Sequence, residues 1–353
     1  MEIDILKMTA SPSSTIAKTM ELINQNAKGI ALIVNEKQEL IGTITDGDIR
    51  RGFLAGLHME DPAEKVMKKN PLVLPISIQK EYRKEFMRIN KIRHLPLVGT
   101  HNRLMAMEWQ SIYNDEDQHL TAMIMVGGEG QRLRPLTNNL PKPMIKVGGK
   151  PLLHNLIESL KNVGFNRILL NVRYLAQAIE DYFQDGENFG IKIYYIREPQ
   201  PMGTAGGIGL IPDSLKPPVS FLVLNGDLLT TLNFRVFHDF HEAATYDFTL
   251  CGRPYEVRIP FGYPKMEGDL VREFLEKPTF SYLVNSGIYC LSPEVIDYVP
   301  KNKYLDMPDL IRKLLQEGKK VGTFPLREKY HEIGRLESLE KAEEFYRENF
   351  AGK

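Results

Sequence analysis

The residues of this chain best suited to chemistry lie in one loop, VGGEGQRLRPLTNNLPKPM, which spans residues 126–144. Its glycines are Gly127, Gly128 and Gly130. Glycines allow a close approach of the backbone and present several N–H groups to anionic oxygens. Three cations, Arg132, Arg134 and Lys142, follow on the same loop, and prolines stiffen the path between them. Several cations on a stiff, glycine-rich loop indicate a bound triphosphate.

Neither common phosphate-binding pattern fits this loop. No GK[ST] follows Gly130, and the G-x-G-x-x-G spacing with a distal acidic partner is absent. A dinucleotide-dependent dehydrogenase is therefore a weak alternative. A basic surface loop with structural glycines is the other interpretation.

The loop resembles the G-G-x-G-x-R-L-x-P-L-T…P-K-P-M signature of the sugar-1-phosphate nucleotidyltransferases. The resemblance implies that Arg132 binds the triphosphate tail and that Lys142 neutralises charge around the reacting phosphates. It also implies that Gly128, between Gly127 and Gly130, lies against the nucleotide.

Two further segments match the family in its order along the chain. EPQPMGTAGG at 198–207 resembles the segment that reads the base, and this implies nucleotide binding by Glu198 and Gly203. A Gln often precedes that segment, whereas this chain has Arg197, which leaves the base open. LVLNGDLLT at 222–230 resembles a strand end that places Gly226 at the nucleotide and makes Asp227 a ligand of Mg²⁺.

The sugar side of the expected site comes from three later segments. FLEKP at 274–278 implies Glu276 on the sugar hydroxyls and Lys277 on the sugar phosphate. VNSGIYCLSP at 284–293 places Asn285 on the sugar ring, and PFGYP gives Gly262 a backbone contact to another hydroxyl.

The segment YHEIGRLESLEKA at 330–342 takes the place of a W-x-D-I-G segment whose Asp is the second metal ligand. This chain has Glu332 there, one methylene longer. Glutamate keeps the charge, but Mg²⁺ requires near-octahedral geometry at about 2.1 Å, so metal affinity or preference is expected to differ. His331 is expected to be a packing or surface residue.

The resemblance implies transfer of a nucleoside monophosphate from a nucleoside triphosphate to a sugar-1-phosphate. Its catalytic residues would be Arg132, Lys142, Asp227 and Lys277. A narrower resemblance, to bacterial glucosamine-1-phosphate guanylyltransferases of legionaminic acid biosynthesis, favours GTP and glucosamine-1-phosphate. Mannose-1-phosphate guanylylation and glucose-1-phosphate thymidylylation or uridylylation remain open. An alternative of another class is a catalytically silent protein that senses nucleotides.

The elements that position these residues alternate between strand and helix. Apolar strand patterns occur at 121–126, 167–172, 191–196 and 219–225. Amphipathic helical patterns occur at 151–164 and 175–185, and a helix is expected near 205–211. This alternation predicts an α/β, doubly wound, mostly parallel sheet that binds ligands at the carboxyl ends of its strands. The family resemblance implies the Rossmann-like fold of nucleotide-diphospho-sugar transferases over residues 120–353, with a mixed sheet.

The first 115 residues contain a diverged repeat. Residues 29–49 and 93–112 each read strand, turn, strand and incipient helix, and a helical pattern precedes each, at 15–27 and 80–92. The repeat resembles a CBS pair, a smaller α/β unit over 1–115 joined by a linker at 116–119.

The CBS resemblance implies an AMP- or GMP-type effector held by Thr45 and Asp48, and a homo-oligomer (dimer or higher). Trp109 and Ile112 replace these two residues in the second half, so at most one intact nucleotide site is expected. The alternative is a packing or dimerisation unit.

Composition and sequence pattern limit the partners, the location and the state of the cysteines. The 45 basic and 45 acidic side chains give a formal net charge of zero, which argues against nucleic acid as a partner. No secretory signal pattern or run of 18 apolar residues occurs, so we expect a cytoplasmic protein without a membrane partner. Cys251 and Cys290 lack metal-ligand spacing and are expected to be reduced packing residues.

Overall fold

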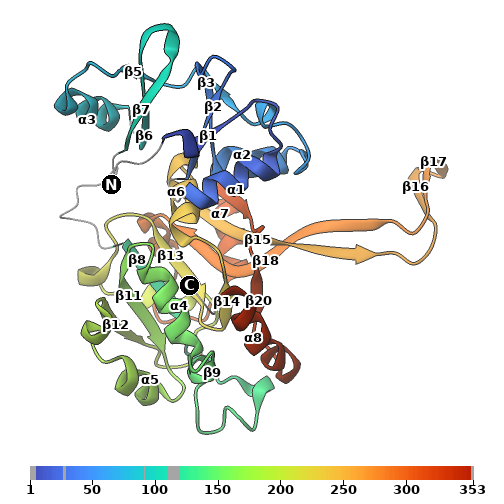
Figure 1. The fold of residues 1–353 in the computed structure, drawn as a ribbon. Coiled ribbons are helices and arrows are strands. Elements are labelled where there is room, and N and C mark those ends of the chain that lie inside the picture. The colour runs from blue at the N-terminus through green and yellow to red at the C-terminus, as the bar shows by residue number, and fades with distance from the viewer. Residues whose placement is uncertain (1–4, 27–28, 91, 110–119, 351–353) are drawn as a thin grey trace. The chain divides into compact units, whose positions relative to one another are not determined.

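The structure, a computed structural model, describes residues 5–26, 29–90, 92–109 and 120–350 (Figure 1). The expected linker at 116–119 and Ile112 lie outside the described residues. The chain divides into two compact units, Met1–Gln118 and His119–Lys353.

The N-terminal unit builds one arrangement twice. In each half a short strand lies parallel to the first strand of an antiparallel pair, and a helix precedes that pair. The elements of the first half are β1 (Thr9–Ala10), α1 (Ile16–Asn26), β2 (Ile30–Val34), β3 (Leu40–Thr45), α2 (Asp46–Leu54) and β4 (Lys68–Lys69). Those of the second half are β5 (Leu74–Pro75), α3 (Lys80–Ile89), β6 (His94–Val98) and β7 (Leu104–Trp109). The strand register shifts just before Val34 and just before Val98, at matching positions of the two halves.

The C-terminal unit is built on a seven-stranded sheet. The strand order is β12 (Lys192–Arg197), β11 (Phe165–Val172), β8 (Leu120–Met125), β13 (Phe221–Asn225), β18 (Thr279–Leu291), β15 (Phe248–Arg258) and β19 (Val321–Pro325). Strand β18 runs antiparallel to both neighbours, and the other neighbouring strands are parallel. The predicted fold class, a mixed and mostly parallel α/β sheet, is confirmed.

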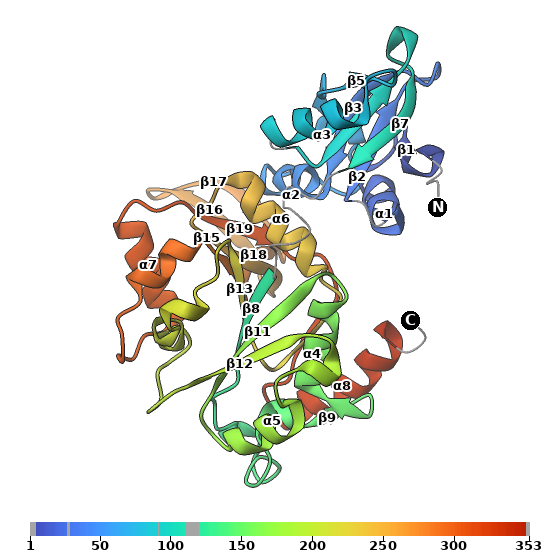
Figure 2. The same ribbon diagram turned by 90° about the vertical axis from the view of Figure 1, so that its left-hand side faces the viewer.

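Helices cover both faces of this sheet, as Figure 2 shows for α4 and α7. One face packs against α4 (Leu152–Lys161), α5 (Ala176–Phe183) and α6 (Phe234–Ala244), and the other against α7 (Met307–Gln316). Successive strand residues point to opposite faces, so Ile124 belongs to the first core and Met123 to the second.

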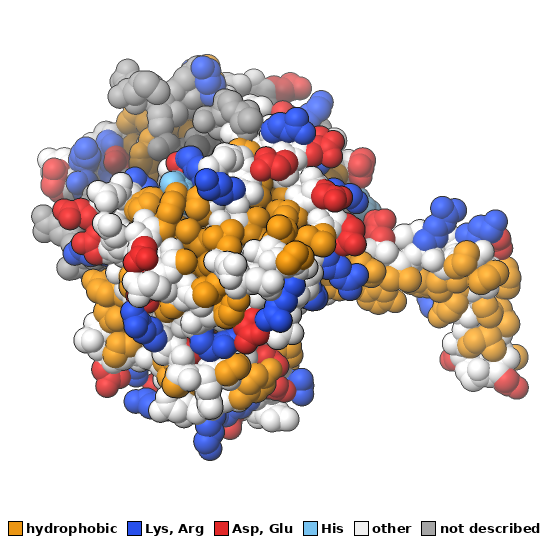
Figure 3. All heavy atoms as spheres, turned by 90° about the horizontal axis from the view of Figure 1, so that it is seen from below, with side chains coloured by type: hydrophobic (Ala, Val, Ile, Leu, Met, Phe, Trp, Pro, Cys, Tyr) orange, Lys and Arg blue, Asp and Glu red, His pale blue; other side chains and the backbone are white. Residues whose placement is uncertain are grey.

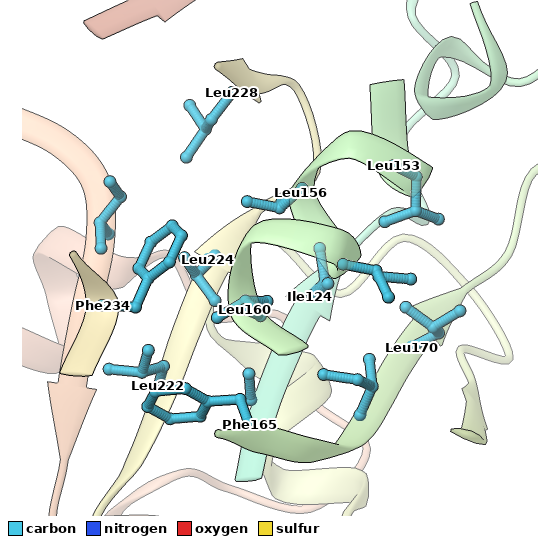
Figure 4. Packing of buried hydrophobic residues seen from close by; sticks show 14 of the residues in the cluster. Ile124, Leu153, Leu156, Leu160, Phe165, Leu170, Leu222, Leu224, Leu228 and Phe234 are labelled. Carbon is cyan, nitrogen blue, oxygen red and sulfur yellow. The ribbon is translucent and has the colours of Figure 1, made fainter. Parts of the chain in front are cut away.

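The core under α4 fixes the strand ends from which the site is built. Figure 4 shows Leu153, Leu156 and Leu160 of α4 lying over strand side chains that include Ile124 and Leu170. All five are almost fully buried, and each such side chain contributes roughly 1.5–3 kcal/mol. The expected helix near 205–211 is a 3₁₀ segment, Gly206–Leu210, because three of its five residues are glycines, which favour an α-helix poorly.

Smaller elements flank the sheet. Strands β9 (Lys146–Val147) and β10 (Lys150–Pro151) form one pair, and β14 (Leu228–Thr230) and β20 (Tyr330–Glu332) another. The last helix, α8 (Leu336–Asn349), packs on a buried cluster that contains Leu133 of the glycine-rich loop and Ile333. Short 3₁₀ segments occupy Ile5–Met8, Ala63–Lys65, Thr100–Asn102, Gln131–Leu133, Lys142–Met144, Glu187–Phe189, Asp213–Leu215 and Pro293–Tyr298. No helix among the described residues is long and apolar enough to cross a membrane.

A two-stranded arm extends from the sheet, toward the right in Figure 1. It consists of the outer parts of β15 and β18, and a small sheet of β16 (Tyr263–Glu267) and β17 (Leu270–Leu275) forms its tip. Cys251 and Cys290, at the root of these strands, are buried and not disulfide-bonded, as expected.

Candidate active site

A cavity of about 530 Å³ opens at the carboxyl ends of four parallel strands. Each strand delivers lining residues where it ends: β8 gives Gly127, β11 gives Arg173, β12 gives Glu198 and β13 gives Asp227. The predicted site residues that line this cavity are Gly127, Gly128, Gly130, Arg132, Lys142, Glu198, Gly203, Gly226 and Asp227. The location agrees with the rule that open α/β sheets bind ligands outside the carboxyl ends of their strands.

The glycine-rich loop forms one wall. Gly130 has a left-handed backbone (φ 62°), and a Cβ there would lie 3.0 Å from side-chain atoms of both Lys142 and Thr137. The Thr137 hydroxyl donates a 2.9 Å hydrogen bond to the carbonyl of Gly130, which closes the loop on itself. Gly128 is different, because a Cβ there would meet no atom within 4 Å. Its surface faces open space in the cavity.

Lys142 and Asp227 form an ion pair at the cavity wall, although 85 residues separate them in sequence. Their side chains are only 13% and 17% exposed. The Lys142 ammonium bonds Oδ2 of Asp227, whereas Oδ1 is buried and has no hydrogen-bond partner among the described residues. A buried carboxylate oxygen without a partner costs free energy, so it favours a ligand that neutralises it.

Glu332 lies beside Asp227 through the pairing of β14 with β20. Leu228 is the register partner of Glu332, and the N–H of Ile333 donates a 3.0 Å hydrogen bond to the Asp227 carbonyl. Burial raises the pKa of Tyr330, and the negative charges of Glu332 and Asp227 raise it further. Both carboxylates therefore lie near the same side chain.

Arg132 reaches this region from the loop. A Cβ placed on Gly334 would lie 3.8 Å from Oε1 of Glu332 and 3.9 Å from Nη1 of Arg132. Within the described part of the chain Arg132 makes no ion pair, and its side chain is exposed at the cavity. His331 stacks on Phe345 of α8 with ring centroids 5.4 Å apart, as expected for a packing residue.

The two carboxylates fit a hard divalent cation. Mg²⁺ is usually bound by one or two carboxylates together with substrate phosphates and water, not by a complete protein cage. The described residues contain no cluster of three or more His, Cys, Asp and Glu side chains that could hold a metal alone. Asp227, with its unpartnered Oδ1, and Glu332 match the two-carboxylate arrangement.

Glu198, which follows β12, contacts both the end of β11 and Gly127 of the glycine-rich loop. Its carboxylate accepts a 2.5 Å hydrogen bond from Asn171 and lies 3.8 Å from Nε of Arg173. A Cβ on Gly127 would lie 3.0 Å from Oε2 of Glu198. Burial raises the pKa of this carboxyl, while Asn171 and Arg173 act in the opposite direction.

Sequence reasoning missed Asn171 and Arg173 as cavity residues. The signal that points to them is their position at the end of the predicted strand 167–172, where ligands of α/β sheets bind. Arg197, by contrast, pairs with Glu180 on the outside of the sheet and does not line the cavity.

The opposite wall is the segment around Gly203, which α7 holds in place. Gly203 has a left-handed backbone (φ 77°), and a Cβ there would lie 2.5 Å from the Leu305 carbonyl, so only glycine fits. The Asp306 carboxylate accepts hydrogen bonds from the Thr204 N–H at 3.0 Å and from the Tyr304 hydroxyl at 2.7 Å. Tyr304 itself lines the cavity and was also missed by the sequence analysis.

The residues expected to hold the sugar phosphate do not line this cavity. Gly262, Glu276 and Lys277 lie together at the outer end of the arm, where a Cβ on Gly262 would be 3.3 Å from Oε2 of Glu276. Asn285 lies at the base of the arm and donates a 2.6 Å hydrogen bond to the Tyr289 hydroxyl.

In the N-terminal unit, Thr45 and Asp48 bond to each other. The Thr45 hydroxyl and N–H both donate to Oδ2 of Asp48, at 2.6 and 2.8 Å, and form a capping box at the start of α2. Oδ1 of Asp48 accepts a bond from Arg51 at 2.6 Å. This carboxylate therefore has a structural role before any ligand binds.

The model of the nucleotidyl transferase family matches residues 121–349. The chain belongs to this family. The model of the CBS domain matches residues 3–55, the first of the two expected modules. The cavity lies wholly within the part that matches the nucleotidyl transferases, and members of that family typically use a divalent metal.

Relatives within the family include the UTP–glucose-1-phosphate uridylyltransferase of Synechocystis sp., which is 35% identical over 56% of this chain and 56% of that protein. The mannose-1-phosphate guanyltransferase of Saccharomyces cerevisiae is 33% identical over 61% of each chain. The chain thus spans little more than half the length of these relatives. The solved structure of HddC from Yersinia pseudotuberculosis complexed with GMP-PN is 28% identical and covers 64% of this chain and 99% of its own, with a TM-score of 0.50.

Proposed function

We propose that this protein transfers a nucleoside monophosphate from a nucleoside triphosphate to a hexose-1-phosphate. The products are a nucleoside-diphosphate sugar and pyrophosphate. The Lys142–Asp227 pair carries the proposal, because it faces the cavity beside the glycine-rich loop and leaves one carboxylate oxygen unpartnered. This arrangement suits a ligand that brings both phosphate oxygens and a cation.

The proposed step is an in-line attack. A phosphate oxygen of the sugar-1-phosphate forms a bond to the α-phosphorus, and the bond from that phosphorus to the pyrophosphate oxygen breaks. The nucleophile is already an anion, so no strong general base is needed, and the barrier lies in aligning two polyanions. Arg132 and Lys142 would offset their repulsion, with Arg132 on the departing pyrophosphate and Lys142 on the reacting phosphates.

Asp227 and Glu332 would hold Mg²⁺. The ion, when bound, would supply positive charge to the phosphates and orient them. The protein's part is to hold Asp227 beside Lys142 and to place Glu332 next to it through β14 and β20. Glutamate has a longer arm than aspartate, so the metal affinity or metal preference of this site should differ from that of an aspartate pair.

GTP and glucosamine-1-phosphate are the favoured substrates, for a nucleotide sugar of bacterial surface glycans or legionaminic acid. Support for a guanine nucleotide comes from relatives named as mannose-1-phosphate guanylyltransferases and from the HddC complex with GMP-PN. The base would lie against Gly203 and Tyr304. Mannose-1-phosphate with GTP, and glucose-1-phosphate with UTP or dTTP, are the alternatives, since a uridylyltransferase is equally similar.

A silent nucleotide sensor is the alternative of another class. It predicts that charged groups at the cavity are lost or paired elsewhere. Arg132, Lys142 and Asp227 all line one cavity, and this supports catalysis over sensing.

Pyrophosphate release tests the proposal. The assay combines four nucleoside triphosphates with glucosamine-, mannose- and glucose-1-phosphate in the presence of Mg²⁺. We expect turnover with GTP and at least one sugar-1-phosphate. Release of no pyrophosphate in any combination, with tight nucleotide binding retained, would favour the sensor.

A further inference from the structure

The arm separates the expected sugar-phosphate residues from the cavity of their own chain. Gly252 to Arg258 of β15 pair without a break with Asn285 to Thr279 of β18. At about 3.4 Å per residue this ribbon is about 20 Å long. Lys277, with a left-handed backbone (φ 48°), lies in the turn beyond its outer end. Among the described residues, Lys277, the group expected to bind the sugar phosphate, is therefore not part of the lining of its own chain's cavity.

The arm exposes much apolar surface. Figure 3 shows hydrophobic side chains along its length. Their exposed fractions range from 36% to 72%, at Tyr255, Val257, Phe261, Tyr263, Met266, Leu270, Val271, Phe274, Tyr282 and Leu283. With about 150–250 Å² for each aromatic side chain, the exposed apolar area is on the order of 1000 Å². This exceeds the patches typical of monomers and matches what one partner of a stable interface buries, about 800 Å².

A two-stranded ribbon is marginally stable in water unless a further surface covers it. At its base, hydrogen bonds hold the arm to the rest of the C-terminal unit. Ser286, 2% exposed, donates a 2.7 Å hydrogen bond to the Cys251 carbonyl, and the Tyr330 hydroxyl donates one of 2.6 Å to the Ser286 carbonyl. The Leu326 N–H donates to the Gly252 carbonyl at 2.7 Å. These bonds tie the base of the arm to the sheet, and none of Gly262, Glu276 and Lys277 lines the cavity of its own chain.

We propose that two copies of this chain exchange arms, so that each arm brings Gly262, Glu276 and Lys277 to the cavity of the other copy. This inference rests on the proposed function. Lys277 would bind the phosphate of the sugar-1-phosphate, and Glu276 would accept hydrogen bonds from the sugar hydroxyls. Asn285, at the base of the arm, stays with its own chain. The exchange is a two-fold, self-complementary contact, which closes at a dimer.

A cross-linking experiment tests the exchange without any need for activity. Two copies of the full chain carry different tags, one with Lys277→Cys and the other with Gly128→Cys. They are co-expressed and treated with a short bismaleimide; both natural cysteines are buried. We expect a covalent dimer with both tags. The matched control replaces Lys277→Cys with Leu315→Cys on α7, which is 55% exposed and should give no covalent dimer.

Two outcomes would contradict the proposal. A chain that carries both Lys277→Cys and Gly128→Cys, and that cross-links only within itself, would overturn the exchange. A wild-type chain that sediments as a monomer at micromolar concentration would also overturn it.

Complementation then tests the catalytic consequence. Asp227→Asn and Lys277→Gln copies, each inactive alone, are co-expressed and isolated as the mixed dimer by two tags. With exchange, the cavity of the Lys277→Gln copy receives an intact arm, so we expect about half of the wild-type rate. Without exchange each cavity keeps one defect, and the mixed dimer stays as inactive as its parents. An inactive wild-type protein would instead refute the proposed function, and the cross-linking result would still decide the exchange.

Discussion

At the scale of single residues, Asp227 combines partial burial, an ion pair and an unpartnered oxygen. Asp227→Asn keeps the size of the side chain but removes the charge that Lys142 and a metal would share. We expect kcat to fall by about 10²- to 10³-fold, as for the loss of other preorganised electrostatic groups. Pyrophosphate release gives the rate, and far-ultraviolet circular dichroism reports whether the fold survives.

Asp297→Asn is the matched control for that substitution. Asp297 also pairs with a lysine, Lys216, at 3.1 Å, but its side chain is 70% exposed and it does not line the cavity. Exposed pairs contribute little, so its rate should stay within about twofold of wild type. Equal losses in the two variants would refute a special role for Asp227.

Gly128 offers a sharper probe of the nucleotide. A Cβ there meets no atom of the protein within 4 Å, and the residue is not among the glycines with a left-handed backbone. Gly128→Ala should therefore leave the thermal midpoint unchanged or raise it slightly. If the nucleotide lies against this backbone, the methyl group displaces it, and kcat/KM should fall by about 10- to 100-fold. Unchanged kinetics would show that the nucleotide does not approach Gly128.

The site residues that could be predicted from the sequence are those that belong to a distinctive motif. The glycine-rich loop, Gly203 and Asp227 were predicted because their spacing is distinctive, and all of them line the cavity. Asn171 and Arg173 belong to no such motif; they reach the cavity only because β11 pairs in register with β8. That register depends on contacts distant in sequence, which a single sequence does not display.

At the scale of elements, the strand–helix alternation predicted the sheet correctly, because buried parallel strands and amphipathic helices have distinct periodicities. The arm could not be predicted in the same way. The direction in which two paired strands leave a sheet depends on hydrogen bonds such as the one from Ser286 to the Cys251 carbonyl. These bonds join residues 35 positions apart.

Helix α8 supports the glycine-rich loop, and two neighbouring glycines test that support. Gly148 and Gly149 both have left-handed backbones (φ 63° and 79°), but a Cβ on Gly148 would lie 2.1 Å from the Tyr346 ring, whereas one on Gly149 would meet nothing within 4 Å. Gly149→Ala should therefore cost about 1 kcal/mol of unfolding free energy from backbone strain alone. Gly148→Ala should cost a further 1–3 kcal/mol, roughly, because the helix must move.

Urea denaturation measures both losses, and the rate of pyrophosphate release shows whether they reach the loop. We expect Gly148→Ala to lower the rate as well, because Leu133 and α8 share one buried cluster and Glu343 accepts the Gly148 N–H at 3.1 Å. Equal losses of stability in the two variants would mean that α8 does not restrain this turn.

At the scale of the whole molecule, an effector at the N-terminal unit would couple two units of one chain. Such coupling is reciprocal: a nucleotide that changes the affinity for the triphosphate must itself bind differently when the triphosphate is present. We expect AMP or GMP to change the rate of pyrophosphate release and to raise the thermal midpoint of the wild-type protein. We expect Asp48→Asn to abolish both effects, because the CBS resemblance implies that Asp48 helps to hold the effector.

The capping role of Asp48 requires a control that separates stability from binding. Asp61 is in the same unit, is 20% exposed against 18% for Asp48, and likewise accepts a backbone N–H, from His58 at 2.7 Å, while pairing with a cation. Each Asn variant should lose some stability, because a neutral amide accepts the backbone N–H less strongly than the carboxylate does. Only Asp48→Asn should lose the response to AMP or GMP. If both variants keep the response, the effector binds elsewhere. If the wild-type protein shows no response, the alternative holds, in which the unit serves packing or dimerisation.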